Sequence, residues 1–295
     1  MDYKVDVLMM AYNHEQFIGQ AIESILAQKT DFSFRLIIGE DFSPDITRQI
    51  CQEYATKFPK QILLVERTKN VGPYQNFVEI YNLASAPYIA LCEGDDYWTD
   101  KAKLQKQIDF LDKNEDFILC FHAVKEIRSN GAVLTSNVNQ KKVTDVTNLI
   151  SGWYMNTASY VFRNVKKIEF PSWFYKVKAT DLCFHILIAE DGGKIYFIEE
   201  VMAVYRRHEG GITDDSKDYI YHLNKNIPFY QEMIGYLESK SSALVDLARE
   251  KLNDIRNKLF YQLYYKKNKG LQDYFTIVQL ALKLRKFKRL KKEES

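Results

Sequence analysis

The chain has 295 residues, of which 46% are hydrophobic and 27% are charged, with only 12 Gly and 6 Pro. This composition is typical of a folded globular protein and excludes the disordered and fibrous classes. The formal net charge of +2 is unevenly distributed, because residues 283–295 hold seven Lys/Arg and two Glu, which leaves a net charge of −3 on the first 282 residues. A near-neutral body argues against a nucleic-acid-binding protein, and the cationic end indicates contact with an acidic surface.

Several other classes are excluded by short patterns. The N-terminal segment carries Asp2, Lys4 and Asp6 before any long apolar run, unlike a signal peptide. No stretch approaches the about 18 apolar residues that a membrane-spanning helix needs. The cysteines form no CxxC pair and lie away from the histidines, which predicts reduced, mostly buried thiols in a cytoplasmic protein rather than a zinc site. These cysteines are Cys51, Cys92, Cys120 and Cys183.

Strand and helix patterns alternate over the first 125 residues. Apolar runs predict strands at residues 5–10, 34–38, 62–65, 88–92 and 117–124. Helical periodicity predicts helices at residues 17–26, 46–58, 74–84 and 101–113. Asn13 is predicted to cap the first helix and Asp45 the second. The alternation predicts an α/β fold, with a mostly parallel sheet flanked by helices.

The rest of the chain changes character twice. Residues 125–215 are less regular, with a turn at 129–131, a strand at 157–163, a helix at 180–189 and short strands at 195–198 and 201–205. From residue 216 the pattern is helical, over 219–237, 243–265 and 271–290. We therefore expect a main domain over residues 1–215 and a helical C-terminal extension with a basic tail over 216–295.

Carboxylates cluster where two predicted strands end. Asp41 follows the second strand, and Glu93, Asp95 and Asp96 follow the fourth. Ligands of open α/β sheets bind outside the carboxyl ends of the strands. Hard divalent cations such as Mg²⁺ and Mn²⁺ take oxygen ligands of this kind. The alternative is a solvated acidic turn that caps the next helix, but the position between an apolar strand and Tyr97 favours a ligand site.

Other polar residues are candidates for binding or proton transfer. Asp41 can accept a hydrogen bond from a uracil or thymine imide or from a ribose hydroxyl, or it can simply stabilise a turn. Asp181, at a predicted helix start, is a helix cap or a general base, and Asp191 competes for the second role. Arg206 and His208 precede a Gly pair and suit phosphate contacts, although a solvent-facing turn has the same composition.

Three common nucleotide or nucleophile motifs are missing from the sequence. It has no GxGxxG after the first strand, no GxxxxGK[ST] and no GxSxG. A dinucleotide site, a P-loop enzyme and a nucleophile-elbow hydrolase are therefore not expected.

The ordered motifs of residues 4–215 resemble the family 2 glycosyltransferases, which have the GT-A fold. The resemblance rests on residues 5–13 (VDVLMMAYN), 18–28 (IxxAIxSILxQ), 40–45 (EDxSxD), 70–72 (NxG), 93–98 (EGDDYW), 103–105 (KLQ), 180–182 (TDL) and 205–213 (YRxHxGGIT). It implies an inverting hexosyltransferase that moves a sugar from a nucleotide-diphosphate sugar to an acceptor hydroxyl. The family often has an Asp where this chain has Glu93.

The resemblance also implies roles for single residues. Asp181 would be the catalytic base, with Asp191 as the open alternative, and Asp96 and Glu93 would hold Mn²⁺ or Mg²⁺ on the diphosphate. The nucleotide would be bordered by Ala11, Tyr12, Asn13, Asp41 on the base, Asp95 on the ribose, and Arg206 and His208 near the diphosphate. The imide contact of Asp41 favours a UDP-sugar over dTDP and GDP donors.

The implied pathway is assembly of a bacterial surface polysaccharide, either a capsule or a lipopolysaccharide O-chain. A sugar nucleotidyltransferase is one alternative, but its Gly/Arg/Lys-rich loop is replaced here by residues 11–15 (AYNHE). A second alternative is a non-catalytic nucleotide-sugar-binding or scaffold subunit, which the intact acidic set disfavours.

The last predicted helix combines an apolar stripe with the basic tail. This pattern predicts peripheral contact with an anionic membrane, on the cytoplasmic face of the inner membrane, and suits a lipid-linked acceptor. A packed helix with a solvated basic tip is the alternative, and Tyr-rich residues 219–265 suggest an oligomer contact. The stripe consists of Leu271, Tyr274, Phe275, Val278 and Leu282.

Overall fold

The computed structural model describes residues 2–136, 139–152, 154–177, 180–208 and 219–293. Contacts divide the chain into two compact units. The first comprises Met1–Val146, Tyr154–Phe170 and Phe184–Asp214, and the second comprises Thr147–Trp153, Pro171–Cys183 and Asp215–Ser295. The predicted boundary between residues 215 and 216 lies outside the described residues. Two segments that the sequence assigned to the first domain belong to the helical unit.

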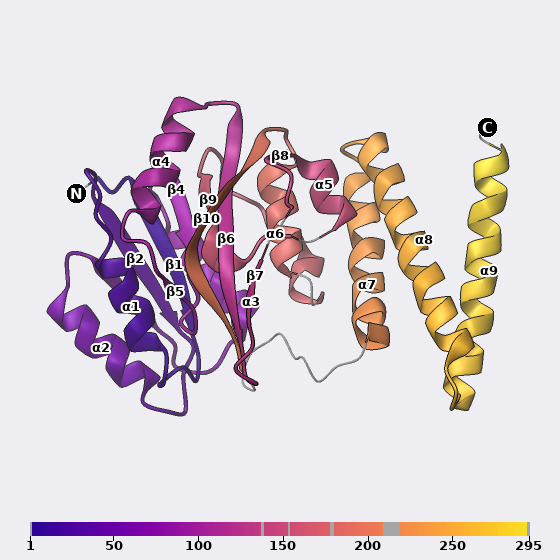
Figure 1. The fold of residues 1–295 in the computed structure, drawn as a ribbon, viewed down its shortest axis with the longest axis horizontal. Helices are drawn as coiled ribbons and strands as arrows, with labels where there is room; N and C mark the ends of the chain where they lie inside the picture. The colour runs from indigo at the N-terminus through magenta and orange to yellow at the C-terminus, as the bar shows by residue number, and fades with distance from the viewer. Residues whose placement is uncertain (1, 137–138, 153, 178–179, 209–218, 294–295) are drawn as a thin grey trace. The chain divides into compact units, whose positions relative to one another are not determined.

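The first unit is built on one sheet, in which the described residues contribute ten strands (Figure 1). Its strand order is β3-β2-β1-β4-β9-β6-β10-β5, with β7 paired to β6 and β8 paired to β10. The strands are β1 (Val5–Ala11), β2 (Phe34–Glu40), β3 (Ile62–Glu66), β4 (Tyr88–Leu91), β5 (Tyr97–Trp98), β6 (Phe117–Arg128), β7 (Val133–Thr135), β8 (Val143–Thr144), β9 (Val161–Arg163) and β10 (Lys194–Arg207).

The direction of the strands decides which loops meet. Strands β3, β2, β1 and β4 are parallel, but β9 lies antiparallel between β4 and β6. The predicted mostly parallel sheet is therefore mixed in its second half. Because two antiparallel steps restore the original direction, β6 and its parallel neighbour β10 point the same way as β1 and β4. The carboxyl ends of β1, β2, β4 and β10 consequently lie along one edge.

Helices cover both faces of this sheet. Helices α1 (Ile18–Leu26), α2 (Thr47–Lys57) and α4 (Lys103–Lys113) pack on one face, where the alternate residues Val5, Val7 and Met9 of β1 point toward Ile22. Helix α3 (Pro73–Leu83) and the later turns of α6 (Thr180–Ala189) cover the other face, through the edge-to-face rings of Phe77 and Phe184. Each fully buried aliphatic side chain contributes about 1.5–3 kcal/mol.

Most predicted elements are confirmed within two residues, but β6 ends four residues later than predicted, β5, β7, β8 and α5 were not predicted, and three further elements differ in kind. Asn13 is not a cap, because α1 begins at Ile18 and the carbonyl of His14 accepts its first turn's N–H groups. Residues 157–163 begin as a 3₁₀ turn (η1, Thr157–Ser159) before β9. The two short strands at 195–198 and 201–205 are one strand, β10, with register shifts between Ile198 and Ala203. All four cysteines are buried free thiols, as predicted.

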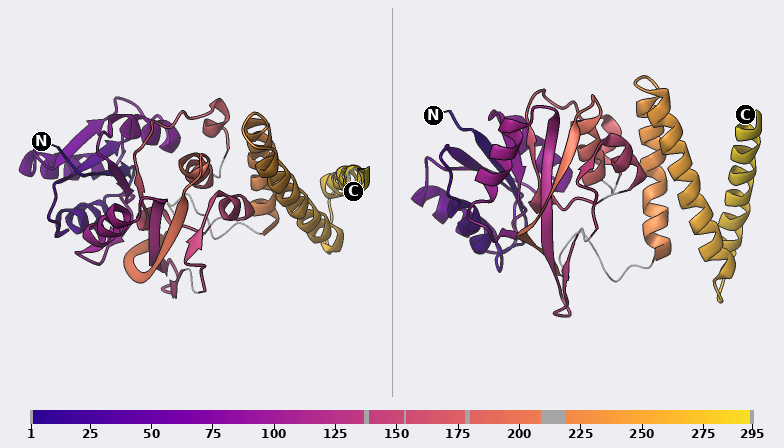
Figure 2. Two further views of the ribbon diagram at one scale, coloured as in Figure 1. Left: turned by 90° about the horizontal axis from the view of Figure 1, so that it is seen from above. Right: turned by 45° about the horizontal axis from the view of Figure 1, so that its top comes forward.

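The second unit is helical. It contains most of α5 (Val146–Ser151), a 3₁₀ turn η2 (Ser172–Tyr175), the first residues of α6, and α7 (Tyr219–Leu237), α8 (Ser242–Tyr265) and α9 (Leu271–Glu293). Figure 2 shows α7, α8 and α9 as successive antiparallel helices. Buried Leu223, Phe229 and Met233 of α7 face α8 residues such as Leu252 and Ile255.

Helix α9 leaves most of its apolar side chains uncovered. Leu280 is buried, whereas Leu271, Phe275 and Leu282 are 91%, 60% and 61% exposed. Within the described residues, no helix is both long and apolar enough to cross a bilayer.

Candidate functional site

The candidate site lies at the sheet edge where β1, β2, β4 and β10 end. Each strand delivers a short polar segment there: residues 12–17 after β1, 41–46 after β2, 92–96 after β4 and His208 after β10. Strand ends are suited to binding because loop residues can point toward solvent while the sheet fixes their backbone.

Two of these segments are held together by hydrogen bonds. The backbone N–H groups of Asn13, His14 and Glu15 donate to Ser43 Oγ, Thr47 Oγ1 and Asp45 Oδ2, at 3.2, 2.8 and 3.0 Å. Asp45 Oδ1 also accepts the N–H of Thr47 at 3.0 Å, but Ile46 occupies the N-cap position of α2, so Asp45 stabilises the turn before the helix and is not the predicted cap. The loop after β1 therefore has a fixed backbone, which positions its exposed side chains.

Asp96 is the most deeply buried carboxylate of the acidic turn. Its side chain is fully buried, Oδ1 accepts the backbone N–H of Arg206 at 2.9 Å, and Oδ2 has no hydrogen-bond partner among the described residues. Burial, together with the neighbouring charge of Asp95, raises the pKa of Asp96 well above its ordinary value. A buried oxygen without a donor is costly unless a cation or another group approaches it.

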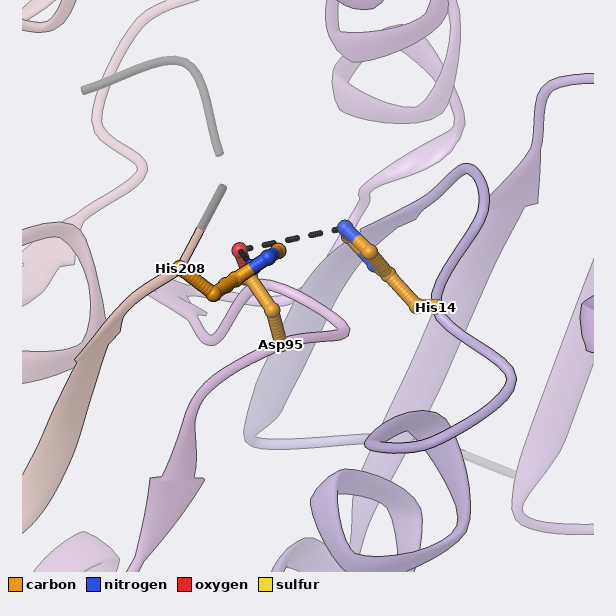
Figure 3. Close-up of side chains that lie close together, drawn as sticks. All are labelled: His14, Asp95 and His208. Atoms are coloured by element: carbon orange, nitrogen blue, oxygen red, sulfur yellow. Dashed lines mark hydrogen bonds and ion pairs between the residues drawn. The ribbon is translucent and has the colours of Figure 1, made fainter. Parts of the chain in front are cut away.

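Asp95 lies between two imidazoles (Figure 3). Its Oδ2 is 3.1 Å from His208 Nε2 and 3.8 Å from His14 Nε2, and its buried Oδ1 has no hydrogen-bond partner in the part of the chain that the structure describes. Burial alone would raise the pKa of Asp95, but the hydrogen bond to His208 and the charge of His14 lower it. The pKa of His14 is lowered, chiefly by burial. The lowered pKa keeps Asp95 ionised beside the two imidazoles.

Gly94 makes room for this arrangement. A Cβ at Gly94 would lie 2.7 Å from His14 Nδ1, 2.7 Å from Ile18 Cδ1 and 3.1 Å from the carbonyl oxygen of Met10. Real side chains essentially never approach so closely. The glycine of the acidic turn is thus required for the close packing of the β4 turn on the loop after β1.

The residues of this cluster fit a divalent cation. One ligand atom each from His14, Asp95 and His208 lies within 4.8 Å of the others. Carboxylate oxygens and imidazole nitrogens are ordinary ligands of Mn²⁺ and related ions. Among the described residues, Glu93 and Asp96, the predicted ligands, are not part of this group. The geometry favours Asp95, assigned above to the ribose, as the carboxylate nearest to a metal.

The side chain of Arg206 contacts several segments of the site and does not point into solvent alone. Its guanidinium donates to the carbonyl oxygen of Asp95 at 2.5 Å and to Gln20, and lies over the rings of Phe17 and Tyr97 at 5.1 and 4.4 Å. These contacts join α1, the acidic turn and the end of β10. A planar guanidinium is suited to this combination of stacking and forked hydrogen bonding.

The predicted nucleotide contacts differ in how accessible they are. Tyr12 and Asn13 are exposed, whereas Ala11 is buried and offers its carbonyl oxygen to the N–H of Asp41 at 3.0 Å. Both carboxylate oxygens of Asp41 accept backbone N–H groups, from Val71 at 2.8 Å and Gly72 at 2.9 Å. Asp41 therefore ties the loop before α3 to this edge, and a base contact would use its remaining lone pairs.

Comparison with known proteins identifies the family. Residues 6–208 match the model of glycosyl transferase family 2, which covers more than half of the chain. This chain belongs to glycosyl transferase family 2. The matched range ends at His208, so it includes every segment that reaches the candidate site.

Relatives in the family differ in what is known of them. An uncharacterized protein of Mycobacterium tuberculosis is 36% identical over 211 residues, which is 70% of this chain and 60% of that protein's length. The Escherichia coli protein WfgD, a UDP-Glc:α-D-GlcNAc-diphosphoundecaprenol β-1,3-glucosyltransferase, is 32% identical over 143 residues, or 48% of this chain and 54% of WfgD. The chain thus spans about 60% of the mycobacterial relative's length.

A solved structure confirms the GT-A architecture. Residues 1–349 of Staphylococcus aureus TarS, in complex with UDP-GlcNAc, superimpose with a TM-score of 0.68 over 94% of this chain and 79% of the TarS chain. The sequence identity is 18%. At this identity the likeness establishes the fold, an α/β sheet flanked by helices with a helical C-terminal extension.

The two candidate bases of this family 2 chain lie in different units and different environments. Asp181 belongs to the helical unit, where desolvation raises its pKa and Lys225 opposes the shift. Asp191 belongs to the sheet unit and pairs with Lys166, which also lies 3.6 Å from Glu190. The ion pair occupies Asp191, which favours Asp181 as the base.

Sequence reasoning missed two residues near the acidic turn. From the sequence, His14 is placed only in the loop of residues 11–15. Its position directly after Tyr12 and Asn13, at a strand end, is the one sequence feature that points to a ligand role. Lys103 is fully buried, with Nζ 2.7 Å from Gln107 Oε1 and 4.0 Å from the centre of the Trp98 ring. Burial lowers the pKa of Lys103 to about 7. A lysine at the start of an amphipathic helix gives no sequence signal of burial.

Proposed function

We propose that this chain is an inverting, metal-assisted glycosyltransferase that adds a sugar from a nucleotide-diphosphate sugar to an acceptor hydroxyl on a growing surface polysaccharide. The observation that carries the proposal is the meeting of His14, Asp95 and His208 at the carboxyl edge of the sheet in a chain of this family. Asp96 and the exposed loop after β1 lie beside this cluster. We assign the cluster to the metal and the diphosphate, and the exposed loop to the nucleoside.

Divalent cations fit this edge because Asp95 and Asp96 each keep a buried oxygen that no described protein group pairs with. His208 and Asp95 would hold the ion, with Asp96 adding negative charge close by. When bound, the ion neutralises the charge that develops on the leaving nucleoside diphosphate. The hydrogen bond from Arg206 to Asp96 keeps the end of β10 against the acidic turn, so His208 is positioned before any ligand arrives.

The donor is proposed to be a UDP-sugar. Tyr12 and Asn13 are exposed next to Asp41, in the position where a base and ribose would border the diphosphate. The UDP-Glc in the name of WfgD and the UDP-GlcNAc bound to TarS support uridine, although Asp41 is also compatible with dTDP donors. Asp41 would face the base, and Asp95, which the sequence assigns to the ribose, would hold the ion instead.

Asp181 is proposed as the general base. It would accept the proton of the acceptor hydroxyl while the acceptor oxygen bonds to the anomeric carbon and the bond from that carbon to the phosphate oxygen breaks. A carboxylate with a raised pKa suits this task, because a base is most effective when its pKa approaches the working pH. One displacement from the opposite face inverts the anomeric configuration.

The acceptor is proposed to be lipid-linked, with the protein held at the cytoplasmic face of an anionic membrane. Exposed apolar residues of α9 are followed by Lys283, Arg285, Lys286 and Arg289, whose side chains contact solvent. An amphipathic basic helix of this kind binds anionic lipid by apolar burial and charge attraction. The diphosphoundecaprenol acceptor named for WfgD supports a lipid-linked substrate. Capsule and lipopolysaccharide O-chain assembly are the pathways that fit.

The test is release of nucleoside diphosphate by the purified chain, with UDP-, dTDP- and GDP-sugars, with Mn²⁺, Mg²⁺ or EDTA, and with a lipid-linked saccharide acceptor. We expect metal-dependent release from a UDP-sugar that is lost in Asp95→Ala and Asp181→Asn and kept in Asp191→Asn. Metal-dependent nucleotide binding without release under any acceptor would instead indicate a binding or scaffold subunit. No nucleotide binding at all would overturn the site assignment.

A further inference from the structure

We propose that His14 supplies a second imidazole to the cation held by Asp95 and His208, so that this chain has a two-histidine, one-carboxylate site selective for Mn²⁺-like ions over Mg²⁺. This inference rests on the proposed function. It adds to that function the set of metal ligands and the class of metal. Neither the family motifs quoted above nor the sequence patterns gave His14 a role.

The distances bring two ligands to one ion and leave the third close to it. Ligand atoms at about 2.1 Å from a cation and about 90–110° apart lie about 3.0–3.4 Å from each other. Asp95 Oδ2 and His208 Nε2 are 3.1 Å apart, within this range. Asp95 Oδ2 and His14 Nε2 are 3.8 Å apart, and the ligand atoms of the three residues lie within 4.8 Å of one another, so the His14 ring must move toward the ion to complete the set.

The imidazole of His14 has no other evident task. At 3.8 Å its Nε2 is too far from Asp95 for a hydrogen bond, and its Nδ1 is buried without a partner among the described residues. The unpartnered Oδ1 belongs to the same Asp95, which is 8% exposed. These unpartnered atoms, His14 Nδ1 and Asp95 Oδ1, belong to the same two side chains as the proposed ligand atoms Nε2 and Oδ2, so each side chain has polar capacity that the described protein groups do not use.

The chain holds His14 in this place by three separate contacts. Its backbone N–H donates to Thr47 Oγ1 at 2.8 Å, which fixes the loop after β1. Its ring packs against Gly94, where any side chain would collide with Nδ1. Its ring is also edge-on to that of His208, with centroids 6.3 Å apart. These contacts keep the ring beside Asp95 and His208 without a ligand, and a movement of the side chain alone would bring it onto an ion.

The donor set determines the preferred metal. Mg²⁺ demands oxygen ligands and keeps several waters, whereas imidazole suits later divalent ions, whose affinities rise from Mn²⁺ through Fe²⁺ and Co²⁺. Two imidazoles and one carboxylate leave open positions for diphosphate oxygens. We therefore expect Mn²⁺ or Co²⁺ to bind the free protein and Mg²⁺ to compete poorly.

The experiment measures metal binding directly, on the full chain and without nucleotide. Mn²⁺ would be titrated by electron paramagnetic resonance, with Mg²⁺ as competitor, and nitrogen coordination would be detected by electron spin-echo modulation. His14→Ala and the larger His14→Gln would be compared with His222→Ala, which removes an imidazole from α7, and circular dichroism would confirm folding of each. We expect at least about tenfold weaker Mn²⁺ binding and loss of one imidazole signal in both His14 variants, with His222→Ala unchanged.

Two results would overturn this inference: Mn²⁺ affinity and nitrogen signal unchanged in both His14 variants, or Mg²⁺ displacing Mn²⁺ at equal concentration. Donor hydrolysis measured on the same samples separates this result from the proposed function. Metal-dependent hydrolysis that ignores His14 would leave the function standing without this ligand. Mn²⁺ held by His14 with no donor hydrolysis would leave the metal site standing without the function.

Discussion

Asp96 Oδ1 accepts the backbone N–H of Arg206 at 2.9 Å, although 110 residues separate the two along the chain. This bond joins the turn after β4 to the last residues of β10, and it thereby holds His208 beside Asp95. The buried Asp96 consequently has a structural task in addition to any role in metal binding. Its neighbour Asp95 carries the two imidazole contacts, so the two aspartates can be separated by experiment.

We expect Asp95→Asn and Asp96→Asn to have different effects. An amide oxygen at position 96 can still accept the Arg206 N–H, so Asp96→Asn should fold normally and lose less Mn²⁺ affinity than Asp95→Asn. Asp96→Ala leaves a buried N–H unpaired and should lower the free energy of unfolding by about 1–3 kcal/mol. Urea unfolding and Mn²⁺ titration of the three variants give both quantities. A larger loss of metal affinity in Asp96→Asn would instead support the ligand assignment made from the sequence.

We expect Gly94→Ala to damage stability and metal binding together. Its Cβ would lie 2.7 Å from His14 Nδ1 and from Ile18 Cδ1, so the loop after β1 must shift. Overpacking of this kind costs about 1–3 kcal/mol. The matched control is Gly19→Ala in α1, where the nearest atom is Tyr54 Oη at 3.8 Å and alanine favours the helix. Equal stability and Mn²⁺ affinity in the two variants would show that the close approach at Gly94 is unimportant.

The buried Lys103 predicts how stability depends on pH. Burial lowers its pKa from 10.5 to about 7 in the folded chain, so between these values the unfolded chain binds a proton that the folded chain lacks. The free energy of unfolding should therefore rise as pH increases from about 7 toward 10. Lys103→Met should remove this rise and stabilise the protein most at neutral pH and below, whereas the exposed control Lys113→Met should keep it. Parallel curves for wild type and Lys103→Met, from urea unfolding between pH 6.5 and 9.5, would contradict this view.

The choice between the two candidate bases can be made by kinetics. We expect Asp181→Asn to lower kcat for sugar transfer by about 10²–10⁴-fold, because a positioned base contributes that much. Asp191→Asn should change kcat little, since Asp191 is paired with Lys166 outside the reaction. The assay is transfer to a saccharide acceptor with saturating metal and donor. Nucleotide binding should be unaltered in both variants, and a kcat loss confined to Asp191→Asn would reverse the assignment.

The surface of α9 gives a prediction about lipid. Replacing Lys283, Arg285, Lys286 and Arg289 by Gln should weaken binding to vesicles that contain anionic lipid, since each charge near the surface contributes about 1 kcal/mol. Phe275→Ser tests the apolar part of the same surface, and vesicles of neutral lipid serve as the control. Co-sedimentation with the vesicles at low and high salt separates the electrostatic contribution to binding from the apolar contribution. Binding that is independent of these residues and of salt would indicate that α9 is covered by another partner, such as a second copy of the chain.

Most helices and strands, and the polar residues at the strand ends, can be predicted from sequence patterns alone. Apolar periods of two and 3.6 residues encode β1, α1 and their successors because the buried face of each element repeats with its geometry. The carboxylates Asp41, Asp95 and Asp96 could be placed on one edge because parallel strands end on the same side. Glycosyl transferase family 2 was also recognisable, because its motifs follow each other in a fixed order.

Which of these side chains come into contact depends on the tertiary fold. His208 reaches Asp95 because β9 inserts between β4 and β6 and because β10 pairs with β6 in the observed register. Local sequence patterns do not predict either feature, since strand pairing depends on contacts between residues far apart in sequence. The roles of His14 and Lys103 also depend on packing. A histidine in a loop and a lysine on a helix look the same in sequence whether they face solvent or another chain segment. Only the close approach allowed by Gly94, and the burial around Lys103, distinguish the two cases.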